Sequence, residues 1–353
     1  KVIGTCTIGT DHIDMDYVEQ ANAERENRIH VFSAPGSNAD SVADHMLYCI
    51  LHLTREAARP LADMSLGIIG YGNCGTRVAR RAEGFGMRIV RNDPPLAERD
   101  PAFESDSLAD ALACDFVTMH VPFTTPDESD WPAHGLVGVG EPARMREDAW
   151  FMNAWRGNVV DSRALIEALK SGTIAGAALD VYEGEPEPPA ELIELSELAT
   201  PHIAGYAIEA KRRGAAVIYE AACRALGLEA IDTQPLLMEG FEPPMGEEVC
   251  FDASGAEAVA ADRAMRAFLK ATDDIKAVSD ELKATLGDPD RAKKFDAMRK
   301  NYETHVGRHE LSTYTVRLDN SVATLLRQAI GVRLAGFGVE IVEDAANYVL
   351  VGE

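Results

Sequence analysis

The sequence has no cysteine pairing pattern and no long apolar run. Its six cysteines include no C-x-x-C pair and no spacing typical of a disulfide framework or a zinc site. No apolar stretch reaches the roughly 18 residues that a membrane-spanning helix needs, and no export segment opens the chain. A reducing, cytoplasmic compartment is therefore expected. We also predict no metal, because His12, His45, His120 and His305 lack ligand-like spacing to other metal-binding residues.

Basic residues are scarce as well. The chain holds 34 Lys and Arg against 58 Asp and Glu, which gives a formal net charge of −24 at pH 7. Such a charge opposes binding to nucleic acid and to anionic membrane surfaces. The 353 residues are enough for two or three domains. Because the chain begins at Lys1, directly in an apolar stretch, we expect the natural protein to extend further toward its N-terminus.

The middle of the sequence alternates short apolar runs with helix-length amphipathic runs. This pattern is typical of a parallel sheet flanked by helices and predicts a doubly wound α/β domain, the Rossmann fold. The predicted strands are 66–69, 88–90, 116–119, 150–152 and 177–180, and the predicted helices are 75–84, 107–113 and 162–170. Asp161 or Ser162 is expected to cap the last helix and Gly172 to end it.

The flanking regions carry different patterns. Ahead of this domain we expect strands at 1–7 and 29–32 and a largely apolar helix at 41–53, and after it a helix at 208–226. Residues 229–246 are rich in proline and are interpreted as a linker. The remaining segment predicts a small α+β domain, with strands at 248–251, 313–318, 339–342 and 348–351 and helices within 257–300 and at 322–335.

A glycine-rich turn follows the first predicted strand of the α/β domain. In G-x-G-x-x-G, Gly70 suits a tight turn, Gly72 lets the backbone approach a pyrophosphate, and Gly75 lets the following helix pack on the sheet. Asp93 follows at about the 20-residue spacing at which a carboxylate accepts the ribose hydroxyls. It would repel a 2′-phosphate, which favours NAD over NADP. The alternative is that Asp93 only forms a turn before Pro94.

A second group of residues suggests redox chemistry on a hydroxy acid. Arg156 and Glu185 lie just past predicted strands, and His202 follows in Thr-Pro-His-Ile-Ala-Gly-Tyr. An imidazole can take the hydroxyl proton while hydride leaves the same carbon, and a carboxylate behind it fixes its tautomer. A guanidinium offers a planar fork to the substrate carboxylate. Taken singly, each residue has a plainer role: a surface cation, a solvated acid and a structural histidine.

These motifs, in this order, resemble the D-2-hydroxyacid dehydrogenase superfamily. Within it, the sequence is most similar to the branch that oxidises 4-phospho-D-erythronate during pyridoxal 5′-phosphate biosynthesis. Residues 295–302 resemble that branch's C-terminal dimerisation domain. The runs that carry the rest of the resemblance are 4–14, 34–39, 68–75, 92–95 and 202–211.

The resemblance implies an NAD-dependent oxidoreductase that is a homodimer and is re-oxidised by a 2-oxo acid. It implies a partial flavodoxin-like substrate lobe at 1–52 with a return helix at 206–228, an NAD domain at 53–205 and a dimerisation domain at 247–353. Arg156, Glu185 and His202 would be catalytic, and Thr7, Arg156 and Tyr206 would bind substrate. The implied cofactor-binding residues are Gly70, Gly72, Asn73, Cys74, Gly75, Asp93, Ala154, Trp155, Arg156, Asp180 and Gly205.

Some positions differ from the usual residues of that branch, and the contacts of the substrate phosphate are undecided. Its members begin earlier in the substrate lobe, Trp155 stands where a small residue is usual, and Asp44 replaces a glutamate. The substrate phosphate would contact 211–213 or 299–300, unless these cations are solvated. Two other functions remain possible at this point: another D-2-hydroxyacid dehydrogenase of the phosphoglycerate or glyoxylate type, or a dinucleotide-binding homologue without turnover.

Overall fold

The structure is a computed structural model that describes most of the chain. The described residues are 1–10, 12–24, 28–127, 129–138, 140–238, 248–306, 308–343 and 346–352. The predicted linker therefore lies partly outside the described residues, as does the side chain of His305. Within the described part, no helix combines the length and the apolar character needed to cross a membrane.

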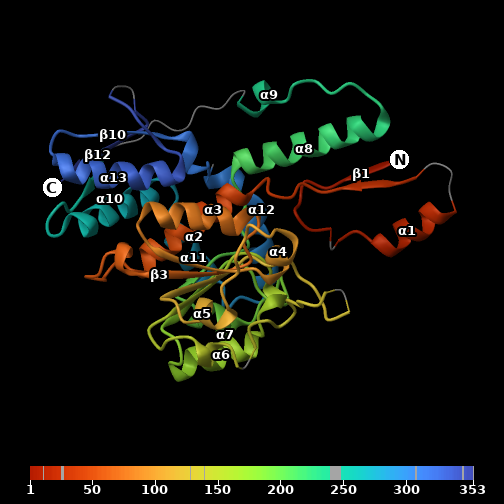
Figure 1. Cartoon of the computed structure of the whole chain (residues 1–353), viewed down its shortest axis with the longest axis horizontal. Coiled ribbons are helices and arrows are strands. Elements are labelled where there is room, and N and C mark those ends of the chain that lie inside the picture. The colour runs from red at the N-terminus through yellow and green to blue at the C-terminus, as the bar shows by residue number, and fades with distance from the viewer. Residues whose placement is uncertain are drawn as a thin grey trace.

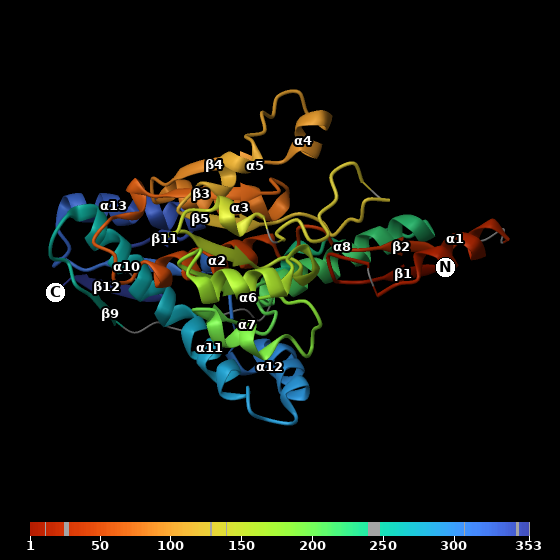
Figure 2. The ribbon, with the colours of Figure 1, turned by 90° about the horizontal axis from the view of Figure 1, so that it is seen from below.

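The predicted α/β domain is present as a parallel sheet with helices on both faces (Figures 1 and 2). Among the described residues it has six strands, in the order β4 (Arg88–Asn92), β3 (Ser65–Ile69), β5 (Phe116–Met119), β6 (Trp150–Asn153), β7 (Gly176–Leu179) and β8 (Leu198–Ala199). The helices of this region are α3 (Asn73–Gly84), α4 (Pro94–Arg99), α5 (Leu108–Leu112), α6 (Ser162–Ser171) and α7 (Ala190–Leu195). Asp161 caps α6, and Gly172 ends it with φ +68°, as predicted.

Three short elements of this region were missed in the sequence. Strand β8 has only two residues, and helix α7 has six. Helix α4 begins with two prolines, which the sequence pattern treats as a turn. Proline fits the first helical turn because the missing N–H would have no helical partner there. The short 3₁₀ segments are Leu61–Asp63, Pro142–Arg144, Gly157–Val159 and Leu311–Thr313.

The N-terminal segment forms a small layer that extends away from the main body (Figure 2). Strands β1 (Val2–Gly4) and β2 (His30–Phe32) pair in parallel, and helix α1 (Met15–Ala23) connects them. Helix α8 (Ile208–Leu226) runs alongside this pair. The contact is close, because a Cβ placed on Gly4 would lie 2.3 Å from Cγ2 of Ile218.

Helix α2 (Ala39–Leu53) is the centre of the molecule. It is buried along almost its whole length, as expected for a helix that is apolar on most sides. It packs against α3 on one side and against α10 (Glu257–Thr272) on the other. One hydrophobic core therefore continues from the sheet domain into the C-terminal region.

The predicted C-terminal region of strands and helices is confirmed, with one difference in pairing. Its strands all pair in parallel, in the order β11 (Glu340–Ile341), β10 (Thr315–Leu318), β12 (Tyr348–Gly352) and β9 (Glu248–Phe251). The arrangement is thus α/β rather than the expected α+β. Its other helices are α11 (Ile275–Ala284), α12 (Arg291–Val306) and α13 (Thr324–Phe337), and a short helix α9 (Gln234–Met238) precedes it. Phe337 of α13 meets Phe85 edge-on, with ring centroids 6.0 Å apart.

Candidate active site

The glycine-rich turn joins β3 to α3 at the carboxyl edge of the sheet. Gly70 has φ +92°, and a Cβ there would lie 2.6 Å from the carbonyl carbon of His120. A Cβ on Gly75 would lie 2.1 Å from the carbonyl oxygen of Gly70. At Gly72, by contrast, a Cβ would meet nothing within 4 Å. The turn therefore requires glycine for shape at two positions and leaves open space at the third.

The start of α3 fits a pyrophosphate. Its N-cap is Gly72, which offers no side-chain cap, so the first N–H groups and the positive end of the helix dipole face the open space. Asp93 lies beside this turn at the end of β4. Its Oδ2 accepts from Tyr71 N at 2.8 Å, and its Oδ1 accepts from Leu96 N at 2.9 Å as the N-cap of α4. A carboxylate can accept further bonds, so the capping role and a ribose contact are compatible.

His202 and Glu185 are in direct contact. Nδ1 of His202 lies 2.7 Å from Oε2 of Glu185, and Oε1 of Glu185 accepts from Tyr182 N at 2.8 Å. Because a carboxylate can only accept, Nδ1 carries the proton, and Nε2 is left as the basic nitrogen. The His202 side chain keeps 34% of its surface exposed, so a substrate can reach it. The predicted histidine–carboxylate pair is therefore assembled in the fold.

The surroundings of His202 tune its protonation. Burial acts to lower the pKa of His202, but the hydrogen bond and charge of Glu185, aided by Asp180, outweigh burial and raise the pKa. Arg299 acts in the opposite direction and lowers it. Asp180 is itself fully buried, and burial raises the pKa of its carboxyl group, opposed by its hydrogen bonds and by His202. The imidazole therefore has a higher affinity for a proton than a free imidazole has, which suits a group that accepts one.

The loop that carries His202 has an unusual backbone. His202 has φ +59°, a region that residues other than glycine seldom adopt. Asp180, at the end of β7, accepts from Ile203 N at 2.8 Å and from Ala204 N at 2.9 Å. It also accepts from the Thr200 hydroxyl at 2.6 Å. One buried carboxylate thereby holds both sides of the strained residue.

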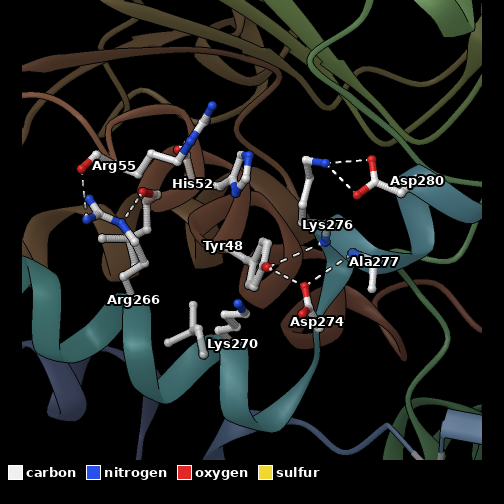
Figure 3. A pocket seen from close by; sticks show the side chains of 11 residues that line it. Tyr48, His52, Arg55, Arg266, Lys270, Asp274, Lys276, Ala277 and Asp280 are labelled. Carbon is white, nitrogen blue, oxygen red and sulfur yellow. Dashed lines mark hydrogen bonds and ion pairs between the residues drawn. The ribbon is translucent and has the colours of Figure 1, made fainter. Parts of the chain in front are cut away.

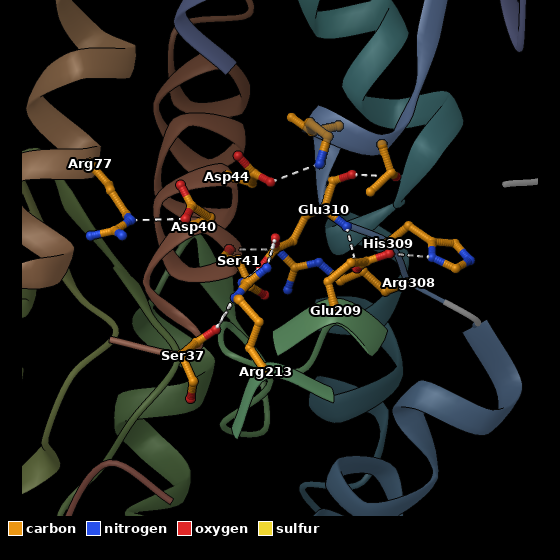
Figure 4. A network of polar contacts seen from close by, with 12 residues as sticks. Ser37, Asp40, Ser41, Asp44, Arg77, Glu209, Arg213, Arg308, His309 and Glu310 are labelled. Carbon is orange, nitrogen blue, oxygen red and sulfur yellow. Dashed lines mark hydrogen bonds and ion pairs between the residues drawn. The ribbon is translucent and has the colours of Figure 1, made fainter. Parts of the chain in front are cut away.

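A residue that the sequence reasoning missed holds the same loop from the opposite direction. Arg308, only 3% exposed, donates to the carbonyls of Ile203 and Ala204, each at 3.1 Å. It also donates to Ser41 O at 2.9 Å and lies 3.1 Å from Oδ2 of Asp273. Arg308 is therefore a positioning residue supplied by the C-terminal region (Figure 4). No local sequence pattern signals it, because every partner is distant along the chain.

Arg156 and Trp155 lie on the loop after β6. Nη1 of Arg156 donates to Trp155 O at 2.9 Å, and its guanidinium lies 5.4 Å from the centre of the Trp155 ring system. Trp155 packs on the core that surrounds α2. A Cβ on Gly157 would lie 2.0 Å from the carbonyl carbon of Tyr182. The Arg156 loop therefore packs directly on the turn that presents Glu185.

Helix α12 brings Arg299 to the same region. Phe295 of this helix meets the Tyr182 ring edge-on, with centroids 6.1 Å apart. Nη2 of Arg299 pairs with Oδ1 of Asp296 at 2.7 Å, while its Nε is buried without a hydrogen bond to any described residue. Its charge is close enough to affect the pKa of His202. Of the cations considered for the substrate phosphate, Arg299 is thus next to the His202–Glu185 pair.

The other candidate cations have different surroundings. Arg213 donates to Ser37 O at 2.8 Å and pairs with Glu310, so it belongs to the polar network in Figure 4. Arg212 donates to Leu237 O at 2.9 Å. Nζ of Lys211 lies 4.6 Å from the centre of the Tyr206 ring, a predicted substrate contact.

The remaining predicted site residues have mainly structural contacts in the described part of the chain. Oγ1 of Thr7 donates to Gly9 O at 2.7 Å and lies 2.7 Å from Oγ1 of Thr5. A Cβ on Gly205 would lie 2.3 Å from Nδ2 of Asn38, so glycine is needed for close packing there. Asn73, Cys74 and Ala154 lie at the first turn of α3 and just past β6, at the same sheet edge.

Comparison with known proteins places the chain in a known family. Residues 50–204 match the family model "D-isomer specific 2-hydroxyacid dehydrogenase, NAD binding domain". The chain is 36% identical over 332 residues to the erythronate-4-phosphate dehydrogenase of Azotobacter vinelandii, covering 94% of this chain and 82% of that protein. It is 45% identical over 240 residues to the Salinibacter ruber enzyme of the same name, but spans only 58% of its length. A crystal structure of Aquifex aeolicus D-lactate dehydrogenase complexed with NAD and lactic acid superposes with a TM-score of 0.50 at 26% identity, over 64% of this chain and 77% of that one.

The fold, the glycine turn and the His202–Glu185 pair define an NAD-dependent dehydrogenase of the D-isomer specific 2-hydroxyacid class. The predicted enzyme class and the predicted NAD-binding domain are confirmed by the family match. Within this class, the chain belongs to the erythronate-4-phosphate dehydrogenase family.

Proposed function

We propose that this chain oxidises 4-phospho-D-erythronate to (R)-3-hydroxy-2-oxo-4-phosphooxybutanoate in the biosynthesis of pyridoxal 5′-phosphate. The single observation that carries the proposal is the 2.7 Å contact between His202 and Glu185 at the sheet edge that also bears the glycine turn. The name shared by the relatives of Azotobacter and Salinibacter supplies the substrate.

The reaction follows from the basic nitrogen of His202. Nε2 accepts the proton of the C2 hydroxyl while hydride leaves C2, and the C2–O bond becomes a carbonyl. Glu185, bonded to Nδ1, stabilises the imidazolium that forms. NAD, when bound, supplies the acceptor for the hydride. Gly70, Gly72 and Gly75 give the turn room for its pyrophosphate, and Asp93 has the chemistry to accept from its ribose hydroxyls.

Substrate recognition is assigned to three further residues. Arg156 would hold the substrate carboxylate through its guanidinium fork. Thr7 and Tyr206 would contact the carbon chain. The other proposed NAD contacts, which share the same sheet edge or the loops above it, are Asn73, Cys74, Ala154, Trp155, Arg156, Asp180 and Gly205.

Arg299 is our candidate for the substrate phosphate. It reaches the His202 region within the same chain, and a buried Nε without a hydrogen bond to the described residues has donor capacity left over. Replacing Arg299 with Ala should raise KM for the phosphorylated acid much more than for an unphosphorylated 2-hydroxy acid. Equal changes in both KM values would rule out the phosphate role.

We further propose the division of the chain that the resemblance implies. Residues 1–52 with 206–228 form part of a flavodoxin-like substrate lobe, 53–205 the NAD domain, and 247–353 a homodimerisation domain. A 2-oxo acid would serve as the acceptor that re-oxidises the cofactor. Sedimentation of the purified chain tests the dimer, for which we expect twice the mass of one chain.

The activity has a direct test. The purified chain is incubated with 4-phosphoerythronate, NAD and 2-oxoglutarate, and formation of the 2-oxo product is followed by mass spectrometry. Product formation that is lost on boiling supports the proposal. Oxidation of 3-phosphoglycerate without turnover of 4-phosphoerythronate would reject it.

A further inference from the structure

A cleft of about 400 Å³ lies away from the catalytic loop, where the C-terminal end of α2 meets α10 and α11 (Figure 3). The catalytic loop packs at the other end of α2, where Asn38 meets Gly205. A 15-residue helix is roughly 22 Å long, so the cleft and the catalytic loop are about one helix length apart. The cleft is therefore separate from the site described above.

The walls of the cleft are rich in basic side chains. They include Arg55, Arg266, Lys270, Lys276 and His52, while the acidic lining residues are Asp274 and Asp280. This is unusual in a chain with a net charge of −24, where an even distribution would place acids in excess along any surface. Helix α11 also begins at this wall, so the positive end of its dipole adds to the potential.

Two of these cations, Arg266 and Lys270, form no ion pair with a described acid. Lys276 pairs with Asp280 at 2.5 Å, and Arg55 pairs with Glu197 at 2.9 Å. Arg266, in contrast, donates only to backbone carbonyls, those of Leu51 and Arg55, and has no carboxylate within 4.0 Å in the described part of the chain. Burial lowers the pKa of Arg266, opposed by the nearby charges of Asp262 and Glu56.

Lys270 lies one turn further along α10. Its ammonium group makes neither a hydrogen bond nor an ion pair to a described residue, and Figure 3 shows the side chain at the cleft with Arg266. Like charges at positions i and i+4 of a helix repel each other. The hydrogen bonds of Arg266 to the carbonyls of Leu51 and Arg55 are explained by its capping of the C-terminal end of α2. That role does not explain the repulsion between Arg266 and Lys270 or the absence of an ion pair.

The side chains of Tyr48 and His52 complete the lining. The Tyr48 hydroxyl lies 3.3 Å from Oδ1 of Asp274 and also accepts from Lys276 N at 3.4 Å. Nε2 of His52 is buried and makes no hydrogen bond to a described residue, and its nearest acid is Glu197 at 3.5 Å. Burial, followed by the charge of Arg55, lowers the pKa of His52, opposed by Glu197.

We propose that this cleft binds a small metabolite through a phosphate group, held between Arg266 and Lys270. A phosphate dianion can pair with both cations at once and offers several acceptor oxygens. The volume is within the range of small-molecule sites. The proposal does not depend on the proposed reaction, because none of the lining residues belongs to the catalytic group.

The test measures phosphate binding to the full chain by isothermal titration calorimetry. Inorganic phosphate is the first probe, with sulfate and chloride at matched ionic strength as references. Lys270 is exposed, so Lys270→Gln should leave the fold and the melting temperature unchanged. The matched control is Lys293→Gln, which neutralises a lysine with 84% of its side chain exposed on α12.

We expect Lys270→Gln to weaken phosphate binding at one site by on the order of tenfold, and Lys270→Glu to abolish that site. Lys293→Gln should titrate as the unchanged protein does. Glycerol 2-phosphate and AMP then distinguish the source of the group: tighter binding than inorganic phosphate identifies a phosphate ester, and equal binding identifies free phosphate.

Identical titrations of the unchanged chain and both Lys270 variants would overturn the proposal. So would a cleft covered by a second copy of the chain, seen as a dimer that phosphate neither binds nor alters. Turnover of 4-phosphoerythronate is measured separately and should be equal in Lys270→Gln and the unchanged protein. Absence of that turnover would count against the proposed function and would leave the binding result intact.

Discussion

The glycine turn and the His202 loop occupy the same edge of one sheet but are built in opposite ways. The turn takes its shape from adjacent residues, chiefly Gly70 and Gly75, which leave no room for a Cβ. The loop places a histidine at φ +59° and depends on distant residues to keep it there. Asp180 binds its N–H groups, and Arg308, about 100 residues later, binds its carbonyls.

This difference separates cofactor binding from catalysis. A local turn tolerates changes elsewhere in the molecule, because its conformation is set by its own residues. A loop held by buried charges responds to any change that removes one of them, since an unpaired charge destabilises its surroundings by several kcal/mol. We therefore expect substitution of His202 or Arg308, neither of which is a proposed NAD contact, to reduce turnover more than NAD binding. Substitution of Asp93, beside the glycine turn, should reduce NAD binding more than turnover.

The largest effect is expected from His202→Asn. Asparagine adopts positive φ more readily than other residues, so the loop conformation should survive. Loss of the general base should lower kcat by on the order of 10²–10⁴-fold. The dissociation constant for NAD, measured by calorimetry, should stay within about twofold, because uncharged contacts of this size contribute little. Loss of NAD binding would mean that His202 is structural.

Arg308→Met should have the next largest effect. It leaves Asp273 without its ion pair and frees the carbonyls of Ile203 and Ala204. We expect a loss of about 3–5 kcal/mol in the free energy of unfolding and a fall in kcat of on the order of tenfold or more. NAD binding should change little.

Arg333→Met is the matched control for this variant. Arg333 is also buried and pairs with Asp262 at 2.8 Å, but it lies between α10 and α13, away from the loop. Arg333→Met should lower the free energy of unfolding by a similar amount and leave kcat unchanged. If both variants lose kcat in proportion to stability, Arg308 has no specific effect on the loop.

The same contrast explains what the sequence could predict. Strand β3, the turn, α3 and Asp93 were predicted because a contiguous pattern encodes them. Arg156, Glu185 and His202 were found through their motifs. The contacts of Arg308 and the cationic cleft could not be predicted, because they join segments up to 267 residues apart and depend on packing. Parallel pairing in the C-terminal sheet was missed for a related reason: strand periodicity does not encode direction.

Asp93 lies beside the glycine turn. Asp93→Asn should weaken NAD binding by on the order of tenfold and reduce discrimination against NADP. The physical reason is that the amide accepts less strongly from ribose hydroxyls and no longer repels a 2′-phosphate. At saturating NAD, kcat should be unchanged. Steady-state kinetics with both cofactors measures the change.

Ser107→Ala provides the comparison for Asp93. Ser107 caps α5 as Asp93 caps α4, so its loss should reduce stability by about 1 kcal/mol. NAD affinity should be unaffected by Ser107→Ala. Equal loss of NAD affinity in the two variants would indicate that Asp93 acts only as a helix cap.

The smallest effects concern pH. In the oxidation direction His202 must be unprotonated, so kcat/KM rises with pH through the pKa of His202. Glu185 raises this pKa and Arg299 lowers it. Glu185→Gln should therefore move the rising limb to lower pH, and Arg299→Met should move it to higher pH. Profiles of kcat/KM between pH 5 and 9 measure the direction of both pH shifts.

Shifts in the same direction would show that the two side chains act on the loop through its structure. Opposite shifts would show that each acts on the imidazole through its charge.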